Sequence, residues 1–561
     1  MDLDDRKITQ LIDNLAGEIE QILRTAKDNN KASYTRKDIT ATGLSSVDKL
    51  LKLNSEINKN FEFVNSNLVV MMNSVKENHE AINVDLSQFS QIIKNINWAS
   101  ESIDKIDLEI VELTKLVEDI KGDTNQIFSL ALNASIVSSK YSQTSGVFDV
   151  LANKLSEMSH FINQNLENIT AVVRPITDGI NKLTYKNALV LGDFEKGYDS
   201  FKEFPVILKR QAESINDLLK KAEDSFNKVE LQKKSLIGMN EQISAADKDA
   251  SGAIEGSGNV ARTAEQLREK LNSIYSMKSS DKDYKNYLTS IKNSAASIWQ
   301  FAQQVNEKSK NQLDVSLKSV DFCDSLIGES VKLKETTIFF NEKTVENNNI
   351  AVDISRKLAS LTTQIDQMKN NIHDSSVTIM KFNQDYKQID DIIQFLKNIL
   401  KTMRLLGMYS RIESARDPEK FSGFITISNN IIQLQDDIQN NIPIIEQNIN
   451  RTHDLISAVN KLFDDISSIF YKIIDDSNVI IGKLENLNQV TTNTEEKSRK
   501  ILSDSGLIDN LLTELKKSII NLTEVVKKPI EGSTANIKRG KSVENICGEI
   551  LADIDTKITS A

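Results

Sequence analysis

The side chains that most often carry chemistry are scarce in this chain and widely separated. Its two cysteines, Cys323 and Cys547, lie far apart in the sequence and predict neither a disulfide framework nor a thiolate metal site. No nucleophile adjoins a base, and no phosphate-binding loop occurs. The histidines lack metal-ligand spacing and are expected on helix surfaces: His79, His160, His373 and His453. We therefore expect no catalytic residues, no metal site and no cofactor, and do not expect an enzyme.

The composition favours long helices. The chain has 19 glycines and 5 prolines among 561 residues, against average usage of roughly 7% and 5%. A sheet fold of this length would need many turns, which these two residue types make. Of all residues, 39% are hydrophobic but only 6% are aromatic. The chain can therefore form long apolar stripes along its helices, but it has few bulky side chains for a thick core. The sequence therefore predicts an all-α protein with extended helical packing.

The charge pattern gives no sign of nucleic-acid or membrane binding. The net charge is −11, both signs are mixed along the chain, and no basic block occurs. No run of about 18 apolar residues is present, and the charged start MDLDDRKITQ lacks the apolar core of a signal peptide. We expect a cytoplasmic protein with no nucleic-acid partner and no direct membrane insertion.

Apolar residues recur at alternating intervals of three and four between Ile82 and Ile127, and only Asp85 and Thr124 interrupt the series. This period keeps one stripe facing partner helices only if the helices supercoil, so it predicts a left-handed coiled coil. A second series starts at Phe148 and continues at intervals of seven. The turn-forming cluster at residues 141–146 lies between the two series and predicts a helical hairpin.

The apolar spacing of the second series recurs 276 residues later in the sequence, from Phe424 to Leu487. A turn at residues 417–420 precedes it, in which Asp417 can cap the returning helix and Pro418 can take its first position. The pattern predicts an internal duplication, with a first hairpin over residues 1–280 and a second over 281–561.

The predicted architecture is a long antiparallel four-helix coiled coil built from two tandem helical hairpins, a single-chain pseudo-dimer. Both tips should lie at one end, and the connector is expected at residues 279–283. Glycine and proline predict breaks at residues 192–205, at residues 252–258 and at Pro443. An aromatic run before Pro205 could fill a gap in the core or line a small-molecule pocket: Phe194, Tyr198, Phe201 and Phe204.

The two tips carry a family pattern. Residues 130–136 read LALNASI and residues 148–152 read FDVLA, while residues 406–412 read LGMYSRI and are followed by Glu413 and Arg416. Both segments resemble the hairpin tip of bacterial chemoreceptors, the methyl-accepting chemotaxis proteins, whose pattern is L-A-L-N-A-x-[IV]-E-A-A-R-A-G-E-x-G-x-G-F-x-V-V-A.

The resemblance implies a role in signalling. Tips of this family bind a histidine kinase and its adaptor, and their Glu and Arg join neighbouring dimers. The second tip keeps this pair as Glu413 and Arg416, whereas the first has Val137 and Lys140 at the corresponding places. The resemblance implies these tip contacts: Leu132, Asn133, Ile136, Lys140, Leu405, Met408, Glu413 and Arg416.

Receptors of this family also carry methylation sites at Glu or Gln pairs flanked by small residues. Glu241 and Gln242, within residues 238–246, are the best match, although the small residue expected before Gly238 is absent. The resemblance implies possible modification at these two positions.

Two classes of function stay open at this stage. The first is a chemoreceptor-like signal transduction or scaffold protein that presents its tips to adaptor and kinase partners and can self-associate. The alternative is a structural coiled-coil spacer or assembly protein that kept the receptor fold without kinase coupling. A helical pore-former or secreted toxin is disfavoured by the polar tips and by the charged N-terminus.

Overall fold

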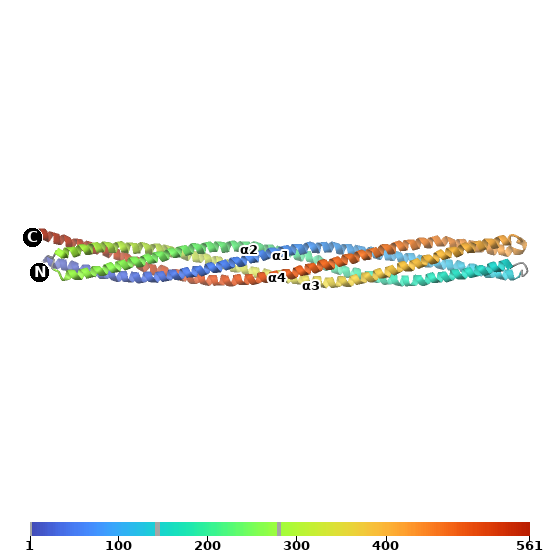
Figure 1. The fold of residues 1–561 in the computed structure, drawn as a ribbon, viewed down its shortest axis with the longest axis horizontal. Coiled ribbons are helices and arrows are strands. Elements are labelled where there is room, and N and C mark those ends of the chain that lie inside the picture. Colours follow the sequence, from blue (N-terminus) through green and yellow to red (C-terminus); the bar gives the residue numbers. More distant parts are fainter. Residues whose placement is uncertain (1–2, 141–145, 278–281, 561) are drawn as a thin grey trace. The chain divides into compact units, whose positions relative to one another are not determined.

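The computed structural model describes residues 3–140, 146–277 and 282–560. These ranges form four long helices, α1 (Leu3–Ser139), α2 (Gly146–Tyr275), α3 (Lys282–Ser414) and α4 (Pro418–Ser560), and contain no strand (Figure 1). Helices α1 and α2 form one antiparallel hairpin, and α3 and α4 form the other. The predicted all-α fold of two helical hairpins is confirmed.

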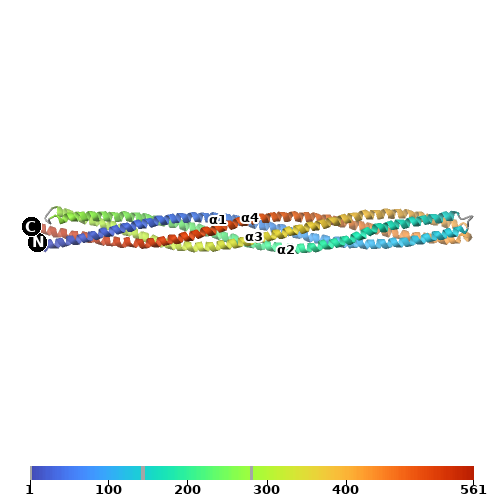
Figure 2. The same cartoon turned by 90° about the horizontal axis from the view of Figure 1, so that it is seen from below.

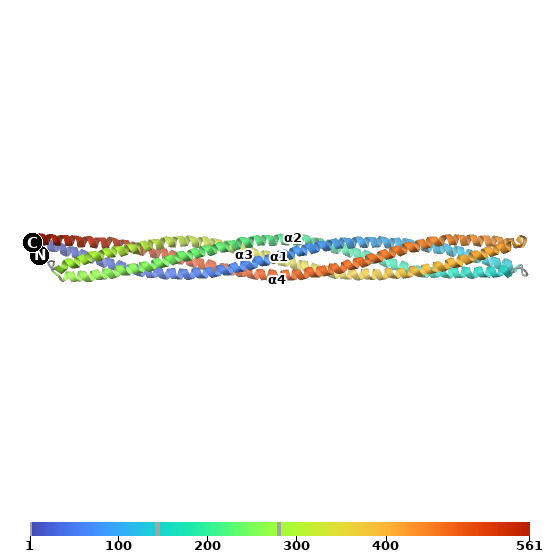
Figure 3. The same cartoon turned by 45° about the horizontal axis from the view of Figure 1, so that its top comes forward.

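The helices contribute segments to two compact units. Unit 1 comprises Met1–Asn73, Glu213–Asn349 and Asn488–Ala561, and unit 2 comprises Ser74–Ala212 and Ile350–Leu487. Within each unit, the four helical segments run alongside one another and wind around each other, as Figure 2 and Figure 3 show from two further sides. Each unit is therefore a four-helix bundle with its own core.

The heptad series form the cores. In unit 2, seam residues such as Ile96, Ile103 and Ile176 are fully buried. In unit 1, one apolar cluster joins all four helices through residues such as Leu15 of α1 and Leu267 of α2. Burying one such side chain contributes roughly 1.5 to 3 kcal/mol, so repetition along each helix supplies most of the favourable free energy.

The predicted helix breaks are wrong. Helix α2 is continuous through residues 192–205 and 252–258, and α4 is continuous through Pro443. Phe204, directly before Pro205, and Leu208, one turn after it, are both buried. A proline inside a helix costs about 3 kcal/mol, and a few buried apolar side chains offset that cost. In α4 the departure from helical φ/ψ falls instead at Phe421, with φ −113° and ψ 20°.

The aromatic run of α2 fills the core of unit 2. Phe194 and Phe201 are fully buried, with ring centroids 5.0 and 5.1 Å from that of Phe89. The Phe194 ring also lies 5.3 Å from that of Phe470 on α4. Of the two interpretations of this run, the core-filling one agrees with the structure.

The helix ends agree in part with the expected turns. Pro418 is the first residue of α4, and the Asp417 carbonyl accepts hydrogen bonds from the backbone N–H groups of Lys420 and Phe421 at 3.2 and 3.0 Å. The expected first tip lies outside the described residues, except for Gly146, which begins α2. The connector was expected at residues 279–283, of which 279–281 lie outside the described residues. Its last two residues instead open α3, where the Asp283 carboxylate favours the helix N-terminus.

Candidate contact surface at the hairpin tips

A small aromatic core holds the hairpin tips together in unit 2. The rings of Phe148 and Phe424 stack with centroids 4.0 Å apart, and the Phe421 ring lies 4.9 Å from that of Phe148. Ala134 of α1 and Leu151 and Ala152 of α2 complete the buried cluster. Because this cluster joins α1, α2 and α4 beside both turns, the two tips lie at the same end of unit 2, as predicted.

The end of α1 carries an exposed apolar stripe. Phe128, Leu132 and Ile136, the α1 stripe, are 37, 47 and 57% exposed. Their four-residue spacing places them on one face of the helix. This face is out of phase with the buried seam, which passes through Ile127, Ala131 and Ala134. The stripe is therefore available for contact with another molecule.

The end of α3 carries a second such stripe. Leu405, Met408, Tyr409 and Ile412, the α3 stripe, are 56, 40, 64 and 59% exposed. Their spacing of three and four residues again defines one helix face. Large apolar side chains gathered on a surface mark contact sites more often than singly scattered ones do. Both tips thus present apolar surface to the solvent.

The α3 stripe ends in an ion pair. The Arg416 Nη1 atom lies 2.8 Å from the Glu413 Oε2 atom, and the arginine side chain is 73% exposed. Glu413 occupies the last turn of α3, and Arg416 lies in the turn that follows. An exposed pair of this kind contributes at most about 1 kcal/mol to folding. The remaining guanidinium N–H groups can therefore serve a partner carboxylate without loss of stability.

One hydrogen bond between hydroxyl groups joins this end of α3 to α4, and another hydroxyl bond lies within α3. The Ser428 hydroxyl donates to the Ser410 hydroxyl oxygen at 2.6 Å, and both side chains are buried. The Ser414 hydroxyl donates to the Ser410 carbonyl, also at 2.6 Å. These bonds fix the end of the helix that carries Glu413.

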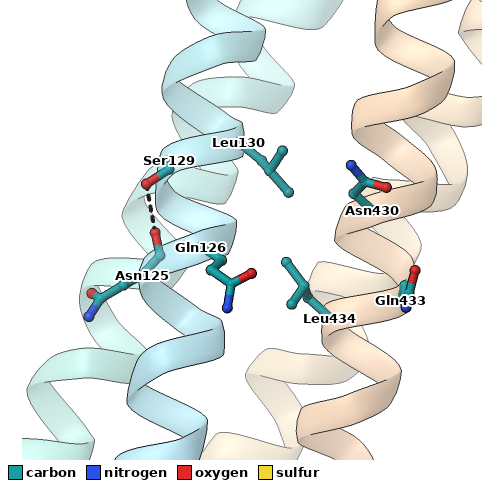
Figure 4. A pocket seen from close by; sticks show the side chains of 7 residues that line it. All are labelled: Asn125, Gln126, Ser129, Leu130, Asn430, Gln433 and Leu434. Atoms are coloured by element: carbon teal, nitrogen blue, oxygen red, sulfur yellow. Dashed lines mark hydrogen bonds between the residues drawn. The ribbon is translucent and has the colours of Figure 1, made fainter.

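A polar groove of about 520 Å³ lies between α1 and α4, next to the α1 stripe. In Figure 4, Leu130 and Leu434 point into the space between the two helices, with Gln126 and Asn430 beside them. The Ser129 hydroxyl donates to the Asn125 carbonyl at 3.0 Å. Because amide side chains both donate and accept, the groove offers a partner hydrogen bonds of both kinds.

The structure places the predicted tip residues on the surface of unit 2. Leu132, Asn133, Ile136 and Lys140 are exposed on or just after the end of α1. On α3 and its turn, Leu405, Met408 and Arg416 are exposed and Glu413 is half-buried. Val137, which replaces the family glutamate in the first tip, packs against the aromatic core.

The predicted tip contacts omit Phe128, Tyr409, Ile412 and the groove residues. The signal for Phe128 was present, because Phe128, Leu132 and Ile136 are apolar at a four-residue spacing outside the seam. The groove residues carry no such signal, since amides on a helix are ordinary surface residues.

The possible modification site lies in unit 1, on α2. Glu241 is exposed, whereas Gln242 is half-buried and accepts a hydrogen bond from the Ser319 hydroxyl at 3.4 Å. Of this pair, Glu241 has the more accessible side chain.

Metal ligands do not gather in the part of the chain that the structure describes: no group of three or more His, Cys, Asp or Glu residues is placed to hold an ion. Cys323 and Cys547 are free and buried, and burial raises the pKa of each thiol to about 12. Both thiols are therefore protonated at neutral pH and unreactive. Among the described helices, none is apolar over a length that could cross a membrane.

Comparison with known proteins finds a distant similarity to chemoreceptors. Two curated proteins, both called methyl-accepting chemotaxis protein PcaY and from two strains of Pseudomonas putida, are each 19% identical to this chain over 314 residues. The alignments cover 55% of this chain and 57 and 56% of the relatives. The chain thus spans about half the length of the curated relatives it matches. No family model matches the chain, and no solved structure matches it.

Proposed function

We propose that the protein is a cytoplasmic, non-catalytic chemoreceptor-like signalling or scaffold protein that presents its hairpin tips to partners of the adaptor and histidine kinase type. One observation carries the proposal. Exposed apolar stripes lie at the tips of both hairpins, and the α3 stripe ends in the Glu413–Arg416 pair. The distant similarity to methyl-accepting chemotaxis proteins supports it.

The second tip is the principal contact in this proposal. Its α3 stripe has four exposed apolar side chains, and the adjacent pair offers one group of each charge. The first tip has only a single charge at the matching places, from Lys140. Apolar area with a few charges at its edge is the usual composition of a protein contact site.

The two hairpins act in this proposal as the two halves of a receptor dimer joined in one chain. Contact between Phe148 and Phe424, which are counterparts under the 276-residue shift, supports this arrangement. A fused pair differs from a homodimer because its tips can diverge, so a single molecule can present two unlike surfaces.

Co-sedimentation of the full chain with the adaptor and kinase encoded in the same genome tests the proposal. We expect saturable binding that is lost in the double variant Leu405→Glu with Ile412→Glu, because buried carboxylates would oppose the contact. Leu317→Glu, at an exposed leucine of α3 in unit 1, is the matched control and should bind normally. Absence of saturable binding by the unaltered chain would favour the structural spacer.

A further inference from the structure

Helix α3 carries an exposed apolar stripe within unit 1. Val331, Ile338 and Val345, the lateral stripe, are 45, 47 and 41% exposed. Their seven-residue spacing places them on one face of the helix. This face is out of phase with the buried seam, which passes through Leu333 and Phe340. The lateral stripe is therefore not part of the core of unit 1.

The face that carries the lateral stripe borders α4. Asp324, one heptad before Val331 and thus on the same face, forms an ion pair with Lys516 of α4. The ion pair between Lys334 and Asp509 joins the same two helices one turn beyond Val331. A molecule that covers the lateral stripe would therefore also meet α4.

Short side chains line α4 beside the lateral stripe. Gly506 lies one turn from Asp509, and a Cβ built on it would contact no neighbouring helix or side chain within 4 Å. Ser503 and Asn510, which adjoin Gly506 on the helix surface, are both exposed. The half-buried Leu502 adds apolar surface at the same level. This wall leaves the lateral stripe open to another molecule.

Packing of the four helices does not require apolar residues at these positions. Under the 276-residue shift, Val331 and Ile338 correspond to Ser55 and Glu62 of α1. Ser55 is half-buried and Glu62 is exposed, and α1 packs in the same unit with these polar side chains. Apolar side chains gathered on a surface mark contact sites. The lateral stripe therefore indicates a contact beyond the four helices.

Two carboxylates without ion pairs follow the lateral stripe. Glu335 and Glu342 stand four residues after Val331 and Ile338, so each lies beside the stripe on the helix surface. Both are exposed, and neither has an ion pair among the described residues. Complementary charge at the edge of a contact selects the partner. Basic residues at the partner's edge are therefore favoured.

A second copy of this chain does not meet that requirement. An antiparallel two-fold contact centred on Ile338 would place Glu335 of each copy beside Glu342 of the other. Like charges set against each other oppose association. The charge pattern thus favours a different protein as the occupant.

We propose that the lateral stripe docks one basic amphipathic helix of a partner protein. This helix has apolar residues at seven-residue spacing, with lysine or arginine beside them. The lateral stripe extends over about 21 Å of α3, so a helix of three heptads covers it. The contact is small, and micromolar affinity is expected. It lies in unit 1 and is independent of the proposed contacts at the tips.

Fluorescence anisotropy of a labelled three-heptad peptide, titrated with the full chain, tests the proposal. The peptide carries leucine at the two core positions of each heptad and lysine at the flanking positions. We expect saturable binding, because leucine would cover the lateral stripe and lysine would meet Glu335 and Glu342. A matched peptide with glutamate in place of lysine should bind at least tenfold more weakly. Absence of saturable binding of the lysine peptide would overturn the proposal, and so would equal binding of both peptides.

Three variants locate the contact. Ile338→Asn should weaken binding of the lysine peptide at least tenfold, and Glu335→Gln with Glu342→Gln should reduce the preference for lysine over glutamate. Ile237→Asn, at a 44% exposed isoleucine of α2 in the same unit, is the matched control and should bind normally. Unchanged binding in Ile338→Asn, or an equal loss in Ile237→Asn, would contradict this site. Dimerisation of the full chain that Ile338→Asn abolishes would show that a second copy is the occupant, and would also overturn the proposal.

Discussion

The rings of Phe148 and Phe424 stack on each other with centroids 4.0 Å apart and planes inclined by 25°. The two residues stand 276 positions apart, each shortly after the turn of its own hairpin. Contact between counterparts is what an approximate two-fold axis between the hairpins would produce. The contact therefore agrees with the predicted internal repeat, which makes these two residues counterparts.

Loss of this stacked pair should loosen the tips. Phe424→Ala removes a buried ring from the aromatic core, and such a change typically costs about 3 to 5 kcal/mol. We expect a lower urea midpoint and faster amide exchange over residues 146–152 and 418–428. Phe161→Ala, at a half-exposed ring of α2, is the control. An equal drop in urea midpoint in both variants would show that the stacked pair stabilises the tips no more than an exposed ring does.

The first hairpin alone should not be a stable monomer. Expressed as residues 1–280, it would expose seam residues such as Ile176 and Leu183, which are buried in the full chain. Apolar stripes of that length drive association. Light scattering on the purified fragment should report a dimer or larger species, and a soluble, folded monomer would contradict the pseudo-dimer.

Asp85 should make the stability of unit 2 depend on pH. It is fully buried in the seam, and its pKa rises from 3.8 to about 8 because burial disfavours the carboxylate and because Asp476 lies nearby, whereas Lys472 opposes the shift. Between about pH 4 and 8, the folded state holds a proton that the unfolded state has lost. The free energy of unfolding should therefore fall as pH rises through this window, by up to about 1.4 kcal/mol per pH unit.

Asp85→Asn removes the titrating group. Relative to the unaltered protein, this variant should gain stability steadily from pH 5 to pH 8 in urea unfolding. Asp464→Asn, at an exposed aspartate of α4, should show no such trend. A constant stability difference between the Asp85 variant and the unaltered protein across this range would be inconsistent with a proton held on Asp85.

Much of the fold could be predicted because heptad spacing and burial have the same physical cause. Heptad spacing places Ile103 and Leu183 on apolar stripes, and such a stripe is stable only when other helices cover it. Both residues are therefore buried. The predicted breaks at residues 192–205, at residues 252–258 and at Pro443 are absent because packing outweighs local helix propensity and keeps these helices continuous.

Less of the candidate site than of the fold could be predicted from the sequence. The family pattern pointed to Glu413 and Arg416, but exposure of the α3 stripe depends on which face the neighbouring helices leave uncovered. The burial of Arg36 in unit 1 gave no signal at all, since an arginine in a charged helical segment is ordinarily a solvated surface residue. Only the placement of four helix segments around it shows that it is buried.

We propose above that the second tip is a charged and apolar contact surface for signalling partners. Its most direct test is the affinity of the full chain for the adaptor and kinase before and after the double change Glu413→Arg with Arg416→Glu. Because Arg416 is exposed and Glu413 keeps part of its side chain in solvent, the melting temperature should be nearly unchanged. We expect binding to weaken at least tenfold, since contact charges would then face like charges. Equal affinity of both proteins would contradict a charged contact at this tip.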